Sequence, residues 1–174
     1  MRVCAVASLY GQVGLDAMYR HTSQEKICHA DDEQPDWSAA PTGTLMRLFG
    51  ADASRLRMQF MPYAGRSDWL VGGTPSQVPQ RYADLCALTY VHRDCPPTLL
   101  IHGTHDEMAP VTAVRELQHR LEGAGARVSA LYLPHTDHMF DLIGTPWSPT
   151  ARVTFCTLER FLAVISGAAK PLPT

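Results

Sequence analysis

The chain has 174 residues, of which 45% are hydrophobic and 18% are charged, and its formal net charge at pH 7 is −2. This length suffices for one globular domain with a buried core and is too short for two large ones. The small net charge argues against nucleic acid or an anionic membrane as the main partner, so we expect a small, uncharged substrate. No segment reaches the roughly 18 apolar residues needed to span a bilayer.

The cysteine content bounds the redox setting. The five cysteines are Cys4, Cys28, Cys86, Cys95 and Cys156. Because they form no CxxC pair and are irregularly spaced, neither a zinc site nor a disulfide framework is indicated, and we expect reduced thiols in the cytoplasm. The apolar run Val3 to Leu9 is too short for a signal peptide.

The first half of the chain predicts one strand and a lid. Arg2 to Tyr10 is small and apolar and ends at Gly11, which indicates a buried strand. Gln12 to Pro41 is polar with little periodicity, so we expect a loop. Two short helices are expected at Thr44 to Phe49 and Ser54 to Phe60. Together they make residues 11–69 a lid-like segment, whose alternative role is a binding wall formed by Met58, Phe60, Met61 and Trp69.

The second half predicts a strand, a helix and a second strand. Thr98 to His102 and Val128 to Leu133 are apolar runs bounded by proline or glycine. Between them, Thr112 to Glu122 has apolar residues at three- and four-residue spacing, which indicates an amphipathic helix. Two parallel strands joined by a right-handed helical crossover have their carboxyl ends at the same edge of the sheet.

Helices are expected before and after this strand–helix–strand unit in the sequence. A short helical piece is expected from Tyr82 to Leu88, and a final helix is expected after a cap at Thr150. Its buried stripe would consist of Phe155, Leu158, Leu162 and Ile165. Residues 168–174 are rich in proline and are expected to be a frayed tail.

Asp106 and His138 follow the two second-half strands, so we expect them to lie together at the carboxyl edge of the sheet. A carboxylate beside an imidazole forms the supporting half of a nucleophilic triad, in which the acid orients the base and the base takes the proton of the nucleophile. The alternative is that Asp106 caps a turn and His138 is a half-exposed surface histidine.

Other polar residues at the same two strand ends allow a metal-dependent hydrolase as a further alternative. They are His102, His105, Asp106, His135, Asp137 and His138. Imidazoles and carboxylates are good zinc ligands, but these spacings do not match a tight tetrahedral set, so no metal or cofactor is expected.

Three stretches resemble the esterase and lipase branch of the α/β-hydrolases, which includes feruloyl-esterase-like and hormone-sensitive-lipase-like enzymes. They are LVGGTPSQVPQRYADLCALTYVHRDCPP, LLIHGTHDEMAP and LPHTDHMFD. The resemblance implies an α/β fold that corresponds to the C-terminal portion of such a hydrolase, with about three parallel strands and flanking helices. It also implies a carboxylic ester substrate, Asp106 as the orienting acid and His138 as the general base.

The family's nucleophile motif, GxSxG, and its HGGG-type oxyanion loop do not occur in the sequence. Ser8 lies between Val6 and Tyr10, where a nucleophile elbow needs small residues, and Ser67 has Trp69 in place of the second glycine. We therefore expect an incomplete hydrolase domain over residues 1–174 that is inactive alone. Its first strand would then self-associate or pair with an N-terminal half; the alternative is a non-catalytic interaction module.

Overall fold

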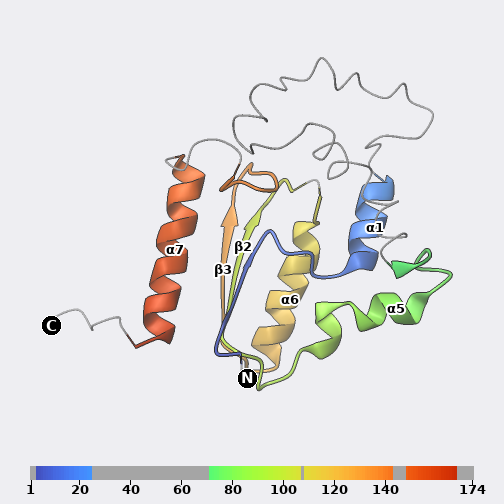
Figure 1. Ribbon diagram of the computed structural model, residues 1–174, viewed down its shortest axis with the longest axis horizontal. Helices are drawn as coiled ribbons and strands as arrows, with labels where there is room; N and C mark the ends of the chain where they lie inside the picture. The colour runs from blue at the N-terminus through green and yellow to red at the C-terminus, as the bar shows by residue number, and fades with distance from the viewer. Residues whose placement is uncertain (1–2, 25–70, 107, 143–147, 168–174) are drawn as a thin grey trace, which may run out of the picture. The chain divides into compact units, whose positions relative to one another are not determined.

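The computed structural model describes residues 3–24, 71–106, 108–142 and 148–167 (Figure 1). The chain divides into two compact units. The first consists of Met1–Val13 and Cys86–Thr174, and the second of Gly14–Leu85. The first unit contains the sheet.

The sheet of the described residues has three parallel strands, β1 (Val6–Leu9), β2 (Thr98–Gly103) and β3 (Val128–Leu133), in the order β1-β2-β3. The register aligns Leu99 of β2 with Ala7 on one side and with Ser129 on the other. An α/β fold with three parallel strands and flanking helices is therefore confirmed.

The central strand β2 is buried along its whole length. Because side chains alternate between the two faces of a strand, Leu99 and Ile101 lie on one face and Leu100 and His102 on the other. Leu99 and Ile101 pack with Phe140 of the turn after β3 in a core that also contacts helix α7 (Pro149–Ile165). Helix α6 (Val111–Gly123) contacts β2 and β3, and Figure 1 shows α6 and α7 on opposite sides of these strands.

The predicted elements between residues 98 and 133 match the structure within one residue at each end. The prediction for the first strand is wrong in two respects. β1 covers Val6–Leu9 only, and Val6 is 38% exposed rather than buried. Among the described strands β1 has a ladder partner only on its β2 side, so its apolar side chains are covered less completely than those of β2.

The final helix exists, and Leu158 of its predicted stripe packs against the core, but the predicted cap and two residues of the stripe are wrong. Ser148, not Thr150, is the N-cap, because its Oγ accepts a hydrogen bond of 3.2 Å from the Ala151 N–H. Phe155 and Leu162 are 41% and 50% exposed. The inward face instead carries Ala151 and Thr154, which are buried, and Leu158 and Phe161, which pack against the core.

The burial of a hydroxyl explains why the stripe was misplaced. Thr154 Oγ1 donates to the carbonyl oxygen of Thr150 at 2.8 Å, so the hydroxyl is satisfied within the helix and its burial carries little cost. A stripe read from large apolar residues alone is thus rotated by about one residue from the true one.

In the second unit, the described helices are α1 (Leu15–Gln24) and α5 (Pro79–Asp84). Their buried core is formed by Leu15, Met18, Val71 and Tyr82. The prediction of a polar loop from Gln12 onward is therefore wrong for α1, whose apolar residues at positions 15, 18 and 19 have helical spacing.

The helical piece expected at Tyr82 to Leu88 is divided between the end of α5 and a 3₁₀-helix, η1 (Ala87–Tyr90), of the first unit. The two helices expected at 44–49 and 54–60, the binding wall and Ser67 lie outside the described residues. Within the described ranges, no helix combines the length and the hydropathy that a bilayer span requires.

Candidate active site

The turns that follow β2 and β3 are joined by their backbones. The N–H of Thr104 donates to the carbonyl oxygen of Leu133 at 2.9 Å, and the N–H of His105 donates to that of Thr136 at 3.1 Å. Gly103 makes this close approach possible, because a Cβ at that position would collide with the carbonyl oxygen of Thr136. These contacts fix the spacing between the two turns.

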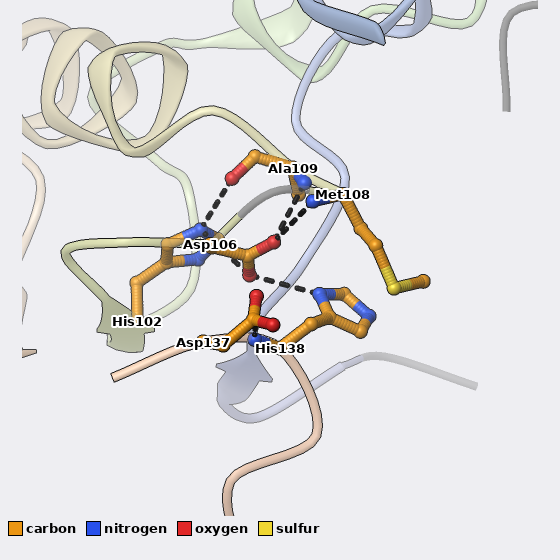
Figure 2. Close-up of polar contacts among 6 residues, drawn as sticks. All are labelled: His102, Asp106, Met108, Ala109, Asp137 and His138. Carbon is orange, nitrogen blue, oxygen red and sulfur yellow. Dashed lines mark hydrogen bonds and ion pairs between the residues drawn. The ribbon is translucent and has the colours of Figure 1, made fainter. Parts of the chain in front are cut away.

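The side chain of Asp106 is fully buried at the end of this first turn. Its Oδ1 accepts hydrogen bonds from the backbone N–H groups of Met108 at 2.9 Å and Ala109 at 2.7 Å. Its Oδ2 lies 2.8 Å from Nδ1 of His138 and 3.3 Å from Nε2 of His102 (Figure 2). The carboxylate therefore caps its own turn and contacts an imidazole at the same time.

His138 comes from the turn after β3 and is 9% exposed, so it is not a half-exposed surface residue. Its backbone N–H donates to Oδ1 of Asp137 at 2.6 Å, which fixes the turn locally. Because an ionised Asp106 can only accept, the proton in the 2.8 Å contact sits on Nδ1 of His138. In a neutral ring Nε2 is then left with a lone pair that can accept a proton.

Tyr10, at the end of β1, is a site neighbour that the sequence interpretation missed. Its ring centroid lies 4.6 Å from that of His138, and it meets Phe140 edge-on at 5.2 Å. Burial, together with the charge of Asp141 and a hydrogen bond to its carboxylate, raises the pKa of the Tyr10 hydroxyl to about 12. The only sequence signal was an aromatic residue between a strand and Gly11.

The backbone around His138 is strained. In the described part of the chain, the non-glycine residues with positive φ are Tyr10 at 43°, His135 at 50° and Met139 at 56°. Tyr10 contacts the His138 ring, Met139 follows it, and His135 precedes it in the same turn. Strained residues of this kind gather at sites whose geometry is held by their surroundings.

The histidines of the metal alternative are engaged in other contacts. His102 and His138 both face Asp106, and the rings of His105 and His135 lie 4.8 Å apart on the exposed side of the turns. Nδ1 of His105 lies 3.0 Å from Oγ1 of Thr104. No group of three or more potential ligands among the described residues is arranged to hold a metal ion.

The two serines considered as nucleophiles differ in what the structure describes. Ser8 lies within β1 and is paired with Leu100 of β2, as expected for a strand residue. Ser67 lies outside the described residues. Neither the role of Asp106 nor that of His138 is tested by this arrangement alone, and both remain predictions.

A buried carboxylate and an imidazole at the carboxyl ends of adjacent parallel strands are the arrangement that α/β-hydrolases use for the acid and the base. Comparison with known proteins agrees with that class. The BD-FAE family model matches residues 53–121, a range that includes Asp106 and ends before His138.

Two curated relatives come from Mycobacterium tuberculosis. The chain is 34% identical over 87 residues to a protein described as "Probable carboxylic ester hydrolase LipM" and 38% identical over 81 residues to the esterase LipQ. These matches cover 49% and 46% of this chain and 20% and 18% of the relatives. The chain therefore spans about a fifth of the length of the curated relatives that it matches.

Among solved structures, an acylaminoacyl peptidase in complex with Z-Gly-Gly-Phe-chloromethyl ketone superposes with a TM-score of 0.58 at 18% identity, covering 92% of this chain and 20% of that one. At this identity the match concerns the fold. Over the part of its length that these matches cover, the chain is similar to esterases and lipases of the α/β-hydrolase class.

Proposed function

We propose that Asp106 and His138 are the acid and the base of a serine-type carboxylic ester hydrolase. The observation that carries the proposal is the 2.8 Å contact between Nδ1 of His138 and Oδ2 of a fully buried Asp106. The positive φ angles of Tyr10, His135 and Met139, which lie next to His138 in contact or in sequence, support the proposal. Backbone strain of this kind is retained at functional sites. The names of the relatives LipM and LipQ support the ester class of substrate.

In this mechanism a serine hydroxyl attacks the ester carbonyl carbon while Nε2 of His138 takes the hydroxyl proton. Asp106 holds Nδ1 protonated and stabilises the imidazolium that forms. The tetrahedral intermediate collapses as Nε2 gives the proton to the leaving alcohol oxygen. Water then attacks the acyl-serine with the same help from His138, which releases the acid and restores the serine.

The nucleophile and the oxyanion donors are proposed to come from residues other than these 174, because neither GxSxG nor an HGGG-type loop occurs in the sequence. The chain alone is then inactive, since removal of a triad nucleophile costs several powers of ten in rate. The substrate is proposed to be a small, uncharged carboxylic ester, in keeping with the net charge of −2.

The test is reconstitution. The chain is assayed on p-nitrophenyl esters alone, and again after mixing or fusion with a fragment of a related esterase that carries GxSxG and the oxyanion loop. We expect hydrolysis only in the second case, and its loss in His138→Ala. Serine-dependent turnover by the chain alone, with a fluorophosphonate label on Ser8 or Ser67, would contradict the proposal.

A second candidate function is that of an interaction module, which the exposure of β1 favours. β1 is one of the two edge strands of the described sheet, Val6 is 38% exposed and the preceding Val3 is 64% exposed. An apolar edge of this kind can add a strand from a second copy or from the fragment that carries the nucleophile. Sizing chromatography at several concentrations distinguishes a monomer from a self-associating chain.

Domain organisation and location complete the proposal. We propose that residues 1–174 belong to one hydrolase domain in which residues 11–69 form a lid-like insertion. We also propose a cytoplasmic location, because the five cysteines form no CxxC pair and are irregularly spaced.

A further inference from the structure

His102 is a fully buried histidine on β2 that the proposed mechanism does not use. It is 1% exposed, and its Nε2 lies 2.9 Å from the carbonyl oxygen of Ala109. A carbonyl oxygen can only accept, so Nε2 carries the proton. The same nitrogen also lies 3.3 Å from Oδ2 of Asp106.

The surroundings of the other ring nitrogen, Nδ1, determine whether His102 is charged. Within the described residues nothing hydrogen-bonds to Nδ1, which is buried. Protonation of Nδ1 would create a buried N–H without an acceptor and a buried charge. Burial lowers the pKa of His102, and the nearby His138 lowers it further, against the opposing effects of Ala109 and Asp106. The ring is therefore neutral at pH 7.

We propose that His102 is a positioning residue, whose neutral Nε2–H ties Oδ2 of Asp106 and the carbonyl oxygen of Ala109 to the buried end of β2. Figure 2 shows the Asp106 carboxylate between the His102 and His138 rings, with Oδ1 held by the backbone of the turn. His102 thus fixes the oxygen that faces His138. This inference rests on the proposed function, because it assigns a support to the same acid.

A neutral donor suits this position better than a charged one. The negative charge of Asp106 is needed to stabilise the imidazolium of His138. A lysine or arginine at position 102 would compete for that charge, whereas a neutral N–H orients the carboxylate and leaves its charge available. His102 can therefore orient the carboxylate of Asp106 without neutralising its negative charge.

The experiment compares His102→Gln with His102→Met in the full chain. Glutamine places an N–H donor close to the position of Nε2, whereas methionine retains the length and removes the donor. His105→Met is the matched control, because it changes an exposed histidine in the adjoining turn. Nitrogen-15 NMR of the histidine rings reports the tautomer of each imidazole, and circular dichroism confirms that each variant is folded.

In the unaltered chain at pH 7 we expect His102 as the Nε2–H tautomer and His138 as the Nδ1–H tautomer. In His102→Met the His138 ring is expected to populate both tautomers, whereas His102→Gln and His105→Met retain the single form. The inference is overturned if folded His102→Met keeps the His138 tautomer unchanged, or if His102→Gln is as disturbed as His102→Met. If His102→Met does not fold, an Nδ1–H or doubly protonated His102 in the unaltered chain would overturn it.

An activity arm separates this inference from the proposed function. In the reconstituted hydrolase, His102→Met is expected to lower kcat about tenfold or more with little change in KM, and His102→Gln to recover most of the loss. A complete lack of reconstituted activity together with the expected NMR result would sink the hydrolase proposal and leave the His102–Asp106 coupling intact. Reconstituted activity with an unchanged kcat in His102→Met would contradict the role of His102 and leave the hydrolase proposal intact.

Discussion

The Tyr10 and His138 rings lie 4.6 Å apart between centroids, although Tyr10 follows β1 and His138 follows β3, which are not neighbours in the sheet. The two residues meet across the end of the central strand β2. As a result the His138 imidazole contacts an aromatic ring in addition to the carboxylate of Asp106. An aromatic contact restricts the ring without occupying its Nε2.

The Tyr10 hydroxyl should make stability fall in strong alkali. Its pKa is raised to about 12 in the folded chain, whereas the ordinary value is 10.0. Between these values the unfolded state has lost a proton that the folded state keeps, so the free energy of unfolding decreases as pH rises from about 10 towards 12. Denaturant unfolding at several pH values measures this slope.

Tyr10→Phe is the matched variant, because it cannot titrate and retains the aromatic ring. The difference in unfolding free energy between the two chains should be constant below pH 9 and shrink above pH 10. Parallel curves across the whole range would show that Tyr10 is not held in its protonated form.

Gly103 should be intolerant of any side chain. A Cβ there would collide with the backbone carbonyl oxygen of Thr136, which cannot move without displacing the turn that carries His138. We expect Gly103→Ala to lower the free energy of unfolding by about 1–3 kcal/mol, as overpacking of a rigid site does. Denaturant unfolding measures it.

Gly123, at the end of α6, provides the control. An added Cβ meets nothing within 4 Å there, so Gly123→Ala should stabilise the helix by about 0.5–1 kcal/mol. Similar destabilisation by both alanine variants would contradict the close approach at Gly103.

His102 should make the chain less stable in mild acid. Burial lowers its folded-state pKa below the ordinary value of 6.5, so the unfolded state takes up a proton that the folded state refuses. The contribution of His102 to the unfolding free energy is therefore fully present above pH 6.5. It is lost as pH drops from there towards the folded-state pKa. His102→Gln, which does not titrate in this range, should show a shallower slope between pH 6.5 and 5. An unchanged slope would mean that His102 is protonated in the fold.

The sequence was most informative where one periodicity dominated. β3 was predicted with both ends correct, and α6 with one residue missing at each end, because their apolar patterns are bounded by proline or glycine. The positions of Asp106 and His138 at neighbouring strand ends followed from the topology of the crossover, whereas the 2.8 Å contact between their side chains depends on the folding of the two turns.

The residues that escaped prediction owe their positions to long-range packing. Tyr10 follows β1 and has no local pattern that marks it, and His102 entered the sequence interpretation only as a possible metal ligand. On α7, Thr154 is buried because its hydroxyl bonds within the helix, while Phe155 is 41% exposed. Apolar character alone therefore could not define the inward face.

The most direct test of the acid–base assignment compares two neighbouring carboxylates in the reconstituted hydrolase. Asp106→Asn should lower kcat by about 10⁴-fold, because an amide at this place favours the wrong tautomer of His138. Asp137 accepts the backbone N–H of His138 at 2.6 Å, and Asn can still accept that bond. Asp137→Asn should therefore change kcat by less than about tenfold. The measurement is kcat for p-nitrophenyl ester hydrolysis at pH 7, and equal losses in the two variants, or no loss in Asp106→Asn, would contradict the assignment.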